Sequence, residues 1–305
     1  MSVTERPIDR LGRRTAGILL ILLAAIGFGT IAIFGTLATD AGLNNPTLLT
    51  VRFALATALL VGYLSYRGDA ARPPREAVPT MVGLGVAYAT LTAAFFWGLL
   101  YVPAGLATIT LYTYPVYVFL IGTALLGEVL TRRKLVALTV AVSGVGLIVG
   151  VDTGGVDPFG LLLVTIAAMA YAVYTTGSRA AVETIGADRL ATAAMATTGA
   201  CFLAYGVASG TLFMPATVRQ WGIIVGLTVA GTVVPILCFV NGLRFVEADR
   251  ASIVSTVEPV VTVLLGIAVL GERLSPTILL GGGLVLAGVL LIRTDDGGTT
   301  VQPSE

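Results

Sequence analysis

The chain contains ten apolar segments, each long enough to cross the hydrocarbon core of a bilayer as an α-helix. Clusters of charged and turn-forming residues separate these segments. Only 11% of the 305 residues are charged, whereas soluble domains carry about 25%, so the chain could not cover its surface with polar groups in water. We therefore predict an all-α, polytopic membrane protein and exclude a soluble enzyme. The predicted transmembrane helices cover residues 16–38, 47–66, 78–100, 104–126, 133–151, 158–178, 188–209, 219–243, 250–270 and 276–293.

Basic residues are concentrated in alternate connections of this pattern. Of the 18 Lys and Arg residues, 15 lie in the tails or in every second loop, whereas the remaining loops hold only Arg219 and Arg273. Cytoplasmic loops of membrane proteins carry an excess of Lys and Arg. We therefore expect both termini in the cytoplasm. The tails, 1–15 and 294–305, carry no organelle-targeting segment, which favours the plasma membrane of the cell as the location.

The two halves of the chain are related by an internal repeat. Residues 95–148 align without a gap with 239–292, and 21 of the 54 positions are identical, where about five would match by chance. The predicted repeats, 16–150 and 158–293, hold five helices each, so the second must enter the membrane in the opposite orientation. Inverted repeats are typical of secondary transporters, whose substrate site lies near the bilayer midplane between the halves.

The most specific part of the repeat is a pair of blocks that each end in Gly-Glu. The first reads P-V-x-x-x-L-x-G-x-x-L-L-G-E at 115–128, and the second reads E-P-V-V-T-V-L-L-G-I-A-V-L-G-E at 258–272. This pattern resembles the EamA-type transporters of the drug/metabolite transporter superfamily, and the resemblance covers nearly the whole chain. It implies a ten-helix permease, often an exporter of amino acids or related small molecules, that works by alternating access.

Several function classes remain open from the residues alone. A facilitator of drugs, nucleosides or other neutral solutes would use the same architecture, and a channel or a polytopic membrane enzyme would be of another class. The chain contains no histidine, the commonest general base, and no convergent group of ionisable residues, so an enzyme is disfavoured. We expect a small-molecule substrate and the lipid bilayer as partners, and no cofactor, metal site or nucleic acid. Proton coupling and the oligomeric state stay undecided.

Glu258 is the only carboxylate well inside a predicted helix, where a charged side chain is unfavourable by about 2.5–3.5 kcal/mol. It shares one helical face with Ser255 and Thr262. Pro259 has no N–H group to donate to the carbonyl of Ser255, which is left free. A polar face beside a free carbonyl fits a substrate cavity. Glu258 could bind a cationic substrate group or a coupling proton; alternatively it is structural, either neutral or paired with Arg52.

Aromatic and hydroxyl residues at helical spacing indicate the rest of the pathway. Tyr114 occupies the position in the first repeat that matches Glu258 in the second, and Trp97 matches Asn241. Such residues could form a cavity that packs around an apolar side chain. The residues predicted to line the pathway are Phe28, Thr30, Tyr88, Trp97, Tyr112, Tyr114, Pro115, Tyr171, Tyr174, Asn241, Ser255, Thr256, Glu258 and Pro259.

Three further features have mainly structural interpretations. Arg52, inside the second predicted helix, could bind a carboxylate or phosphate, but we favour a role in clamping neighbouring carbonyls or reaching the headgroups. Glu128 and Glu272, each followed by Leu and a hydroxyl residue, are predicted to cap the helix that comes next. Glycines at 144 and 281–283 predict a close helix crossing.

Overall fold

The computed structural model describes residues 7–68, 75–126, 157–246, 248–273 and 275–296, with single positions between 132 and 147. All regular elements in these ranges are helices, which confirms the all-α prediction. The other positions of the predicted helix 133–151, Glu128, residues 1–6 and residues 297–305 lie outside the described residues. The helices are α1 (Pro7–Gly29), α2 (Ile31–Asp40), α3 (Asn45–Tyr66), η1 (Arg75–Ala77), α4 (Val78–Gly98), α5 (Ala104–Leu111), α6 (Tyr114–Leu126), α8 (Pro158–Ile185), α9 (Ala187–Ala208), α10 (Val218–Thr228), η2 (Val229–Val233), α11 (Val234–Gly242), α12 (Ala248–Val254), α13 (Val257–Leu270) and α14 (Pro276–Asp296).

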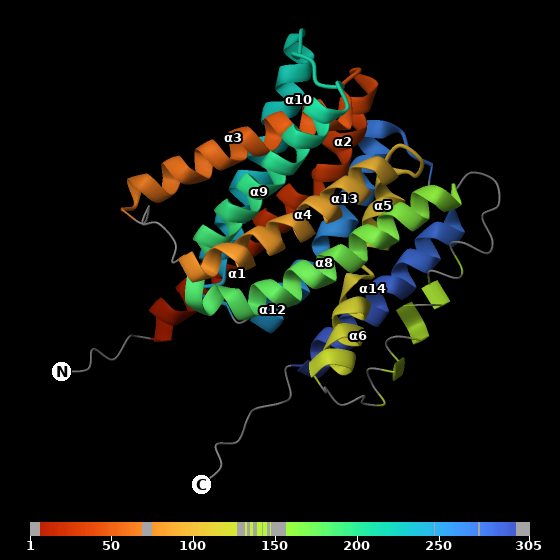
Figure 1. The fold of residues 1–305 in the computed structure, drawn as a ribbon. Helices are drawn as coiled ribbons and strands as arrows, with labels where there is room; N and C mark the ends of the chain where they lie inside the picture. The colour runs from red at the N-terminus through yellow and green to blue at the C-terminus, as the bar shows by residue number, and fades with distance from the viewer. Residues whose placement is uncertain are drawn as a thin grey trace.

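The helices form one bundle in which elements of the two sequence halves pack against each other (Figure 1). Helix α4 lies along α8 and α9, α3 lies along α9, and α1 lies along α11 and α13. Seven helical stretches in the described part are long and apolar enough to cross a membrane, and α13 and α14 are shorter apolar helices. The chain is therefore a multi-pass membrane protein.

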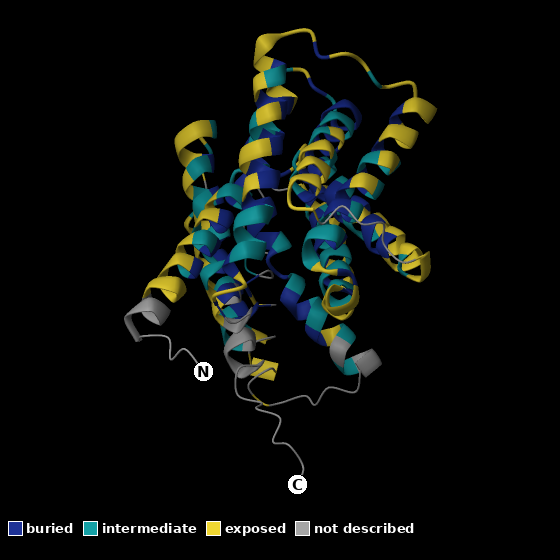
Figure 2. Ribbon diagram, turned by 90° about the vertical axis from the view of Figure 1, so that its left-hand side faces the viewer, coloured by how far each residue is buried: buried dark blue, intermediate teal, exposed yellow. Residues whose placement is uncertain are grey.

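The outer surface of the bundle is apolar along the middle of its helices. Figure 2 shows that exposed residues follow the outward faces while buried residues face the centre. Leu59, Leu162 and Leu264 are large apolar side chains that are about half exposed. Exposing this apolar surface to water would be unfavourable, whereas contact with the apolar chains of lipids carries no such penalty.

Three of the predicted helices are each divided into two. The breaks fall at Thr30 between α1 and α2, at residues 112–113 between α5 and α6, and at residues 255–256 between α12 and α13. The breaks interrupt these stretches without ending them, because Gly12–Asp40 and Ala104–Ile121 are each still long and apolar enough to cross a membrane as one span. At every break a threonine hydroxyl donates to the carbonyl three residues earlier, from Thr30, Thr113 and Thr256, at 2.6–2.7 Å. Such bonds compete with the helical ladder for its acceptors.

The breaks in the two repeats correspond to each other. A shift of 144 residues moves Tyr114, where α6 begins, onto Glu258, one residue after the start of α13. In each repeat a proline, Pro115 or Pro259, follows the break and removes one donor from the ladder. Both repeats therefore carry a discontinuous helix at the same place.

Charged residues predicted for cytoplasmic loops meet at one end of the bundle. Asp188, at the start of α9, forms ion pairs with Arg67 at 3.7 Å and with Arg244 at 3.9 Å. At the other end, the amide of Asn44 donates to the carbonyl of Thr211, and the amide of Gln220 donates to that of Ala41. Arg67 and Arg244, which the charge pattern assigns to the same side of the membrane, therefore also lie close together in the structure.

Glu272 joins the two halves. Its carboxylate accepts hydrogen bonds from the backbone N–H groups of Ala104 and Gly105, the first two residues of α5. The cap predicted for the following helix is formed by the hydroxyl residue Ser275, which accepts from the N–H of Ile278 at 3.2 Å, and not by Glu272. A carboxylate at a helix N-terminus satisfies free donors and interacts favourably with the helix dipole.

Replacing Glu272 by glutamine is expected to lower the free energy of unfolding by about 1 kcal/mol, because the charge and one acceptor are lost at the N-terminus of α5. Thermal unfolding of the purified protein in detergent measures this. Glu183→Gln, at an exposed position of α8, is the matched control and should leave the unfolding temperature unchanged. Equal unfolding temperatures for both variants would show that the cap contributes nothing.

The predicted glycine crossing is confirmed at Gly144. A Cβ atom at this position would lie 2.5 Å from the carbonyl oxygen of Gly281 and 2.9 Å from the backbone nitrogen of Val285. Only a residue without a side chain permits α14 to approach so closely.

Candidate functional site

The hydroxyl of Tyr112 connects the two repeats at their helix breaks. It lies 2.9 Å from Oε2 of Glu258 and 2.8 Å from the backbone carbonyl oxygen of Ser255. Pro259 supplies no N–H for that carbonyl, which accepts instead from the hydroxyl of Tyr112 and from the N–H of Glu258 at 3.1 Å. A carboxylate inside the bundle thus lies beside a discontinuous helix from each half.

Tyrosines from three helices surround this contact. The ring centroids of Tyr114 and Tyr171 are 4.4 Å apart, and those of Tyr112 and Tyr114 are 6.1 Å apart. Tyr88 of α4 and Tyr174 of α8 form a second pair at 5.0 Å. The side chains of Tyr88 and Tyr171 lie within electrostatic range of Glu258. We refer to Tyr88, Tyr112, Tyr114, Tyr171 and Tyr174 together as the tyrosine cluster.

Most side chains of the tyrosine cluster are not completely buried. Tyr88, Tyr114, Tyr171 and Glu258 are each only partly buried. A carboxylate and several phenol hydroxyls therefore lie together in an apolar bundle, and a few polar groups among aromatic side chains are the usual composition of a small-molecule site.

The other residues predicted beside Glu258 serve the backbone. The hydroxyl of Ser255 donates to the carbonyl of Ala251 at 2.9 Å, within its own helix. Thr262, from the same predicted face as Glu258, lies 2.9 Å from the carbonyl oxygen of Gly29 and joins α13 to α1. Thr30, Pro115, Thr256 and Pro259 are located at the helix breaks described above.

Phe28, Trp97 and Asn241 make no hydrogen bond or ring contact with the tyrosine cluster among the described residues. Trp97 follows Tyr88 by nine residues, which is half a turn out of phase on an α-helix, so the two side chains point in opposite directions. The amide of Asn241 donates to the carbonyl of Leu237 in its own helix. These three residues therefore lie apart from the tyrosine cluster.

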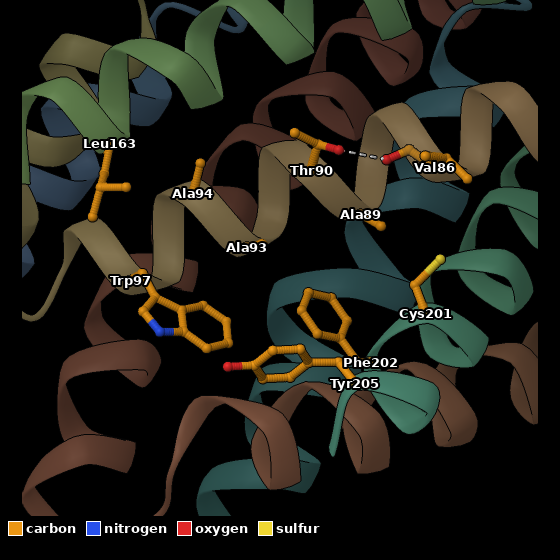
Figure 3. A pocket seen from close by; sticks show the side chains of 10 residues that line it. All are labelled: Val86, Ala89, Thr90, Ala93, Ala94, Trp97, Leu163, Cys201, Phe202 and Tyr205. Atoms are coloured by element: carbon orange, nitrogen blue, oxygen red, sulfur yellow. Dashed lines mark hydrogen bonds between the residues drawn. The ribbon is translucent and has the colours of Figure 1, made fainter. Parts of the chain in front are cut away.

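Trp97 instead lines an apolar groove of about 450 Å³ between α4 and α9 (Figure 3). Its ring meets that of Tyr205 edge-on, with centroids 5.9 Å apart. The lining residues include Ala93, Ala94, Leu163, Cys201 and Phe202. The groove lies outside the tyrosine cluster.

Arg52 is 2% exposed and forms no ion pair with Glu258 among the described residues, so the pairing of these two side chains, one form of the structural alternative, is not seen. Its Nε donates to the hydroxyl of Thr232 at 3.1 Å, and its guanidinium carbon lies 4.8 Å from the ring centroid of Phe53 and 5.4 Å from that of Phe96. Thr232 belongs to η2, a π-helical turn, and its hydroxyl donates to the carbonyl five residues earlier. Sequence reasoning missed Thr232, although Pro235 marks a disturbance of this helix.

A helical bundle that carries an apolar outer surface and a polar site between paired helix breaks defines a membrane transporter. The chain belongs to the EamA-like transporter family, whose model matches residues 15–150 and 158–294, and it is thus a non-enzymatic transporter of the drug/metabolite transporter superfamily. A small-molecule substrate and the lipid bilayer follow from this membership.

Related proteins are named as transporters or exporters. An uncharacterized transporter of Archaeoglobus fulgidus is 28% identical over 89% of this chain and 94% of its own length. A probable terminal-alkyne amino-acid exporter of Streptantibioticus cattleyicolor is 30% identical over 83% of each chain, and the pseudopaline exporter of Pseudomonas aeruginosa is 26% identical over 68% of this chain and 73% of its own. The fold is also similar to that of a protein whose crystal structure is known, with a TM-score of 0.63 and 20% sequence identity. The match covers 91% of this chain and 96% of the other chain.

Proposed function

We propose that the protein is a secondary transporter that exports small organic metabolites of the amino-acid class by alternating access. The observation that carries this proposal is the contact of Tyr112 in the first repeat with Ser255 and Glu258 in the second. Discontinuous helices that meet between inverted repeats are the usual location of a transporter's substrate site. Two relatives are named exporters, one of them of an amino acid, which supports the direction and the substrate class.

We further propose ten transmembrane helices, arranged as inverted repeats at 16–150 and 158–293, with both termini in the cytoplasm of a cell whose plasma membrane holds the protein. The grouping of Arg67, Asp188 and Arg244 at one end supports this orientation. Alternating access then consists of rocking of the two halves about the helix breaks, while the tyrosine cluster stays near the midplane.

Counterflow in proteoliposomes tests the proposal. Vesicles are loaded with one unlabelled amino acid, and uptake of the same labelled amino acid is followed across a panel of all twenty. We expect saturable exchange of a subset of amino acids, because a carrier has a finite number of sites and must bind before it turns over. Empty vesicles without protein provide the baseline.

Other results assign the protein to another class. Flux that rises linearly with concentration indicates a channel. Absence of exchange for all twenty amino acids, together with saturable exchange of nucleosides or drugs, replaces the proposed substrate class by neutral solutes.

A further inference from the structure

Arg52 has more hydrogen-bond donors than the surrounding protein accepts. Its guanidinium carries five N–H groups. Among the described residues, only Nε has an acceptor, the hydroxyl of Thr232, and no carboxylate pairs with the charge. The rings of Phe53 and Phe96 attract the cation but take no ordinary N–H hydrogen bond. A buried cation with most of its donors free is strongly unfavourable unless an anion binds there.

The position of Arg52 relates it to the tyrosine cluster. The side chain of Tyr88 lies within electrostatic range of both Arg52 and Glu258. Phe53, which adjoins the guanidinium, meets the ring of Tyr88 edge-on at 6.2 Å. A cation and a carboxylate that do not pair with each other therefore both lie near Tyr88.

We propose that Arg52 binds the carboxylate of the substrate while Glu258 binds its ammonium group, so that the site selects amino-carboxylate zwitterions. This inference rests on the proposed function and specifies its substrate chemistry. A guanidinium can bind a carboxylate through two parallel hydrogen bonds. The phenol rings between the two charges can pack against the substrate's side chain. Thr232, in its π-helical turn, orients the guanidinium through Nε and leaves the terminal nitrogens for the ligand.

The charge balance favours a carboxylate over a phosphate. Of the basic residues that the structure describes, Arg52 alone is buried. A phosphate group carries up to two charges and takes several cationic partners, whereas a carboxylate carries one charge and matches one guanidinium. A substrate with one carboxylate supplies the acceptors that the terminal nitrogens of Arg52 lack, and its amino group matches the charge of Glu258.

The test compares amino acids with their carboxamides in proteoliposome counterflow. The probes are L-leucine and L-phenylalanine, with leucinamide and phenylalaninamide, which keep the amino group and the side chain but lose the carboxylate. In the wild type we expect the amino acids to exchange at least roughly 10-fold faster than the amides, as for loss of one charged hydrogen-bonded partner. Arg52→Gln should reduce exchange of the amino acids roughly 10- to 100-fold and leave exchange of the amides unchanged.

Two further variants make the result interpretable. Arg67→Gln changes an arginine that directly follows the same helix and pairs with Asp188 at the end of the bundle, and this variant should exchange amino acids at the wild-type rate. Arg52→Lys keeps the charge but loses the two-pronged geometry, and we expect an intermediate preference for the carboxylate. If Arg52→Gln does not fold, Arg52→Lys provides the decisive comparison.

Thermal unfolding of the purified protein supplies a readout that does not depend on transport. Leucine should raise the unfolding temperature more than leucinamide does, and this difference should disappear in the Arg52 variants. If leucine stabilises the protein more than leucinamide does but no counterflow is seen with any amino acid, the inference is supported and the proposed function is refuted. Wild-type exchange of leucine and leucinamide at equal rates would overturn the inference and leave the proposed function standing. An equal reduction of both by Arg52→Lys, or no preferential stabilisation by leucine, would overturn the inference as well.

Discussion

Glu258→Gln is expected to reduce counterflow of amino acids roughly 10- to 100-fold. Glutamine has the same shape as glutamate, and its amide oxygen can still accept the hydrogen bond from Tyr112. The substitution therefore keeps the contact between the repeats and removes only the negative charge and the ionisable proton. A substrate ammonium group loses its partner, and exchange should no longer change with pH if Glu258 carries the coupling proton.

The controls for Glu258→Gln separate charge from structure. Glu183→Gln removes a carboxylate from an exposed position of α8 and should exchange at the wild-type rate with its pH dependence intact. Exchange of acids that lack the amino group should be reduced less by Glu258→Gln than exchange of leucine and phenylalanine. The two acids to be tested are 4-methylpentanoate and 3-phenylpropanoate. Wild-type exchange and wild-type pH dependence in Glu258→Gln would remove this residue from the mechanism.

Gly27→Val is the substitution for which we expect the greatest loss of stability. A Cβ atom at Gly27 would lie 2.4 Å from Cγ of Pro235 and 2.6 Å from the backbone carbonyl oxygen of Ala230. These atoms belong to α11 and to the π-helical turn that holds Thr232, so the new side chain must push the helices apart. Overpacking of this kind destabilises a protein by about 1–3 kcal/mol, and here backbone atoms that cannot rotate away form the obstacle.

The measurement is the yield of monodisperse protein in detergent together with its unfolding temperature. Gly83→Val in α4 is the matched control, because no atom lies within 4 Å of a Cβ at that position. Both variants introduce the same β-branched residue into a helix. The difference between their unfolding temperatures therefore reports only the effect of crowding at the helix crossing. Equal stability of the two variants would show that α1 and α11 can separate without loss.

Local chemistry made part of the site predictable. The missing N–H of Pro259 identified the carbonyl of Ser255 as an acceptor that lacks its regular helical donor, and the period of the helix placed Glu258 on the same face. The spacing of Tyr171 and Tyr174 likewise brought both rings toward the cluster. These predictions depend on a few neighbouring residues, and the fold does not alter them.

Contacts between distant segments could not be predicted in this way. Nothing in the sequence near Arg52 indicates Thr232 as its acceptor, and nothing near Glu272 indicates Ala104. The helix breaks were missed because hydropathy does not distinguish a threonine that donates to its own backbone from one that packs. Its alignment with Asn241 does not place Trp97 beside Tyr88, because the two residues are half a turn out of phase on α4.

The contact of Glu272 with α5 has a consequence for biosynthesis. Helix α5 emerges from the ribosome early, but the carboxylate that caps it follows 168 residues later. Until Glu272 has been synthesised, the first two N–H groups of α5 lack this acceptor. The N-terminal cap of α5 is therefore incomplete while the first half is inserted into the membrane. The last connection of the chain completes a helix of the first half, and a nascent protein truncated before residue 272 would lack that closure.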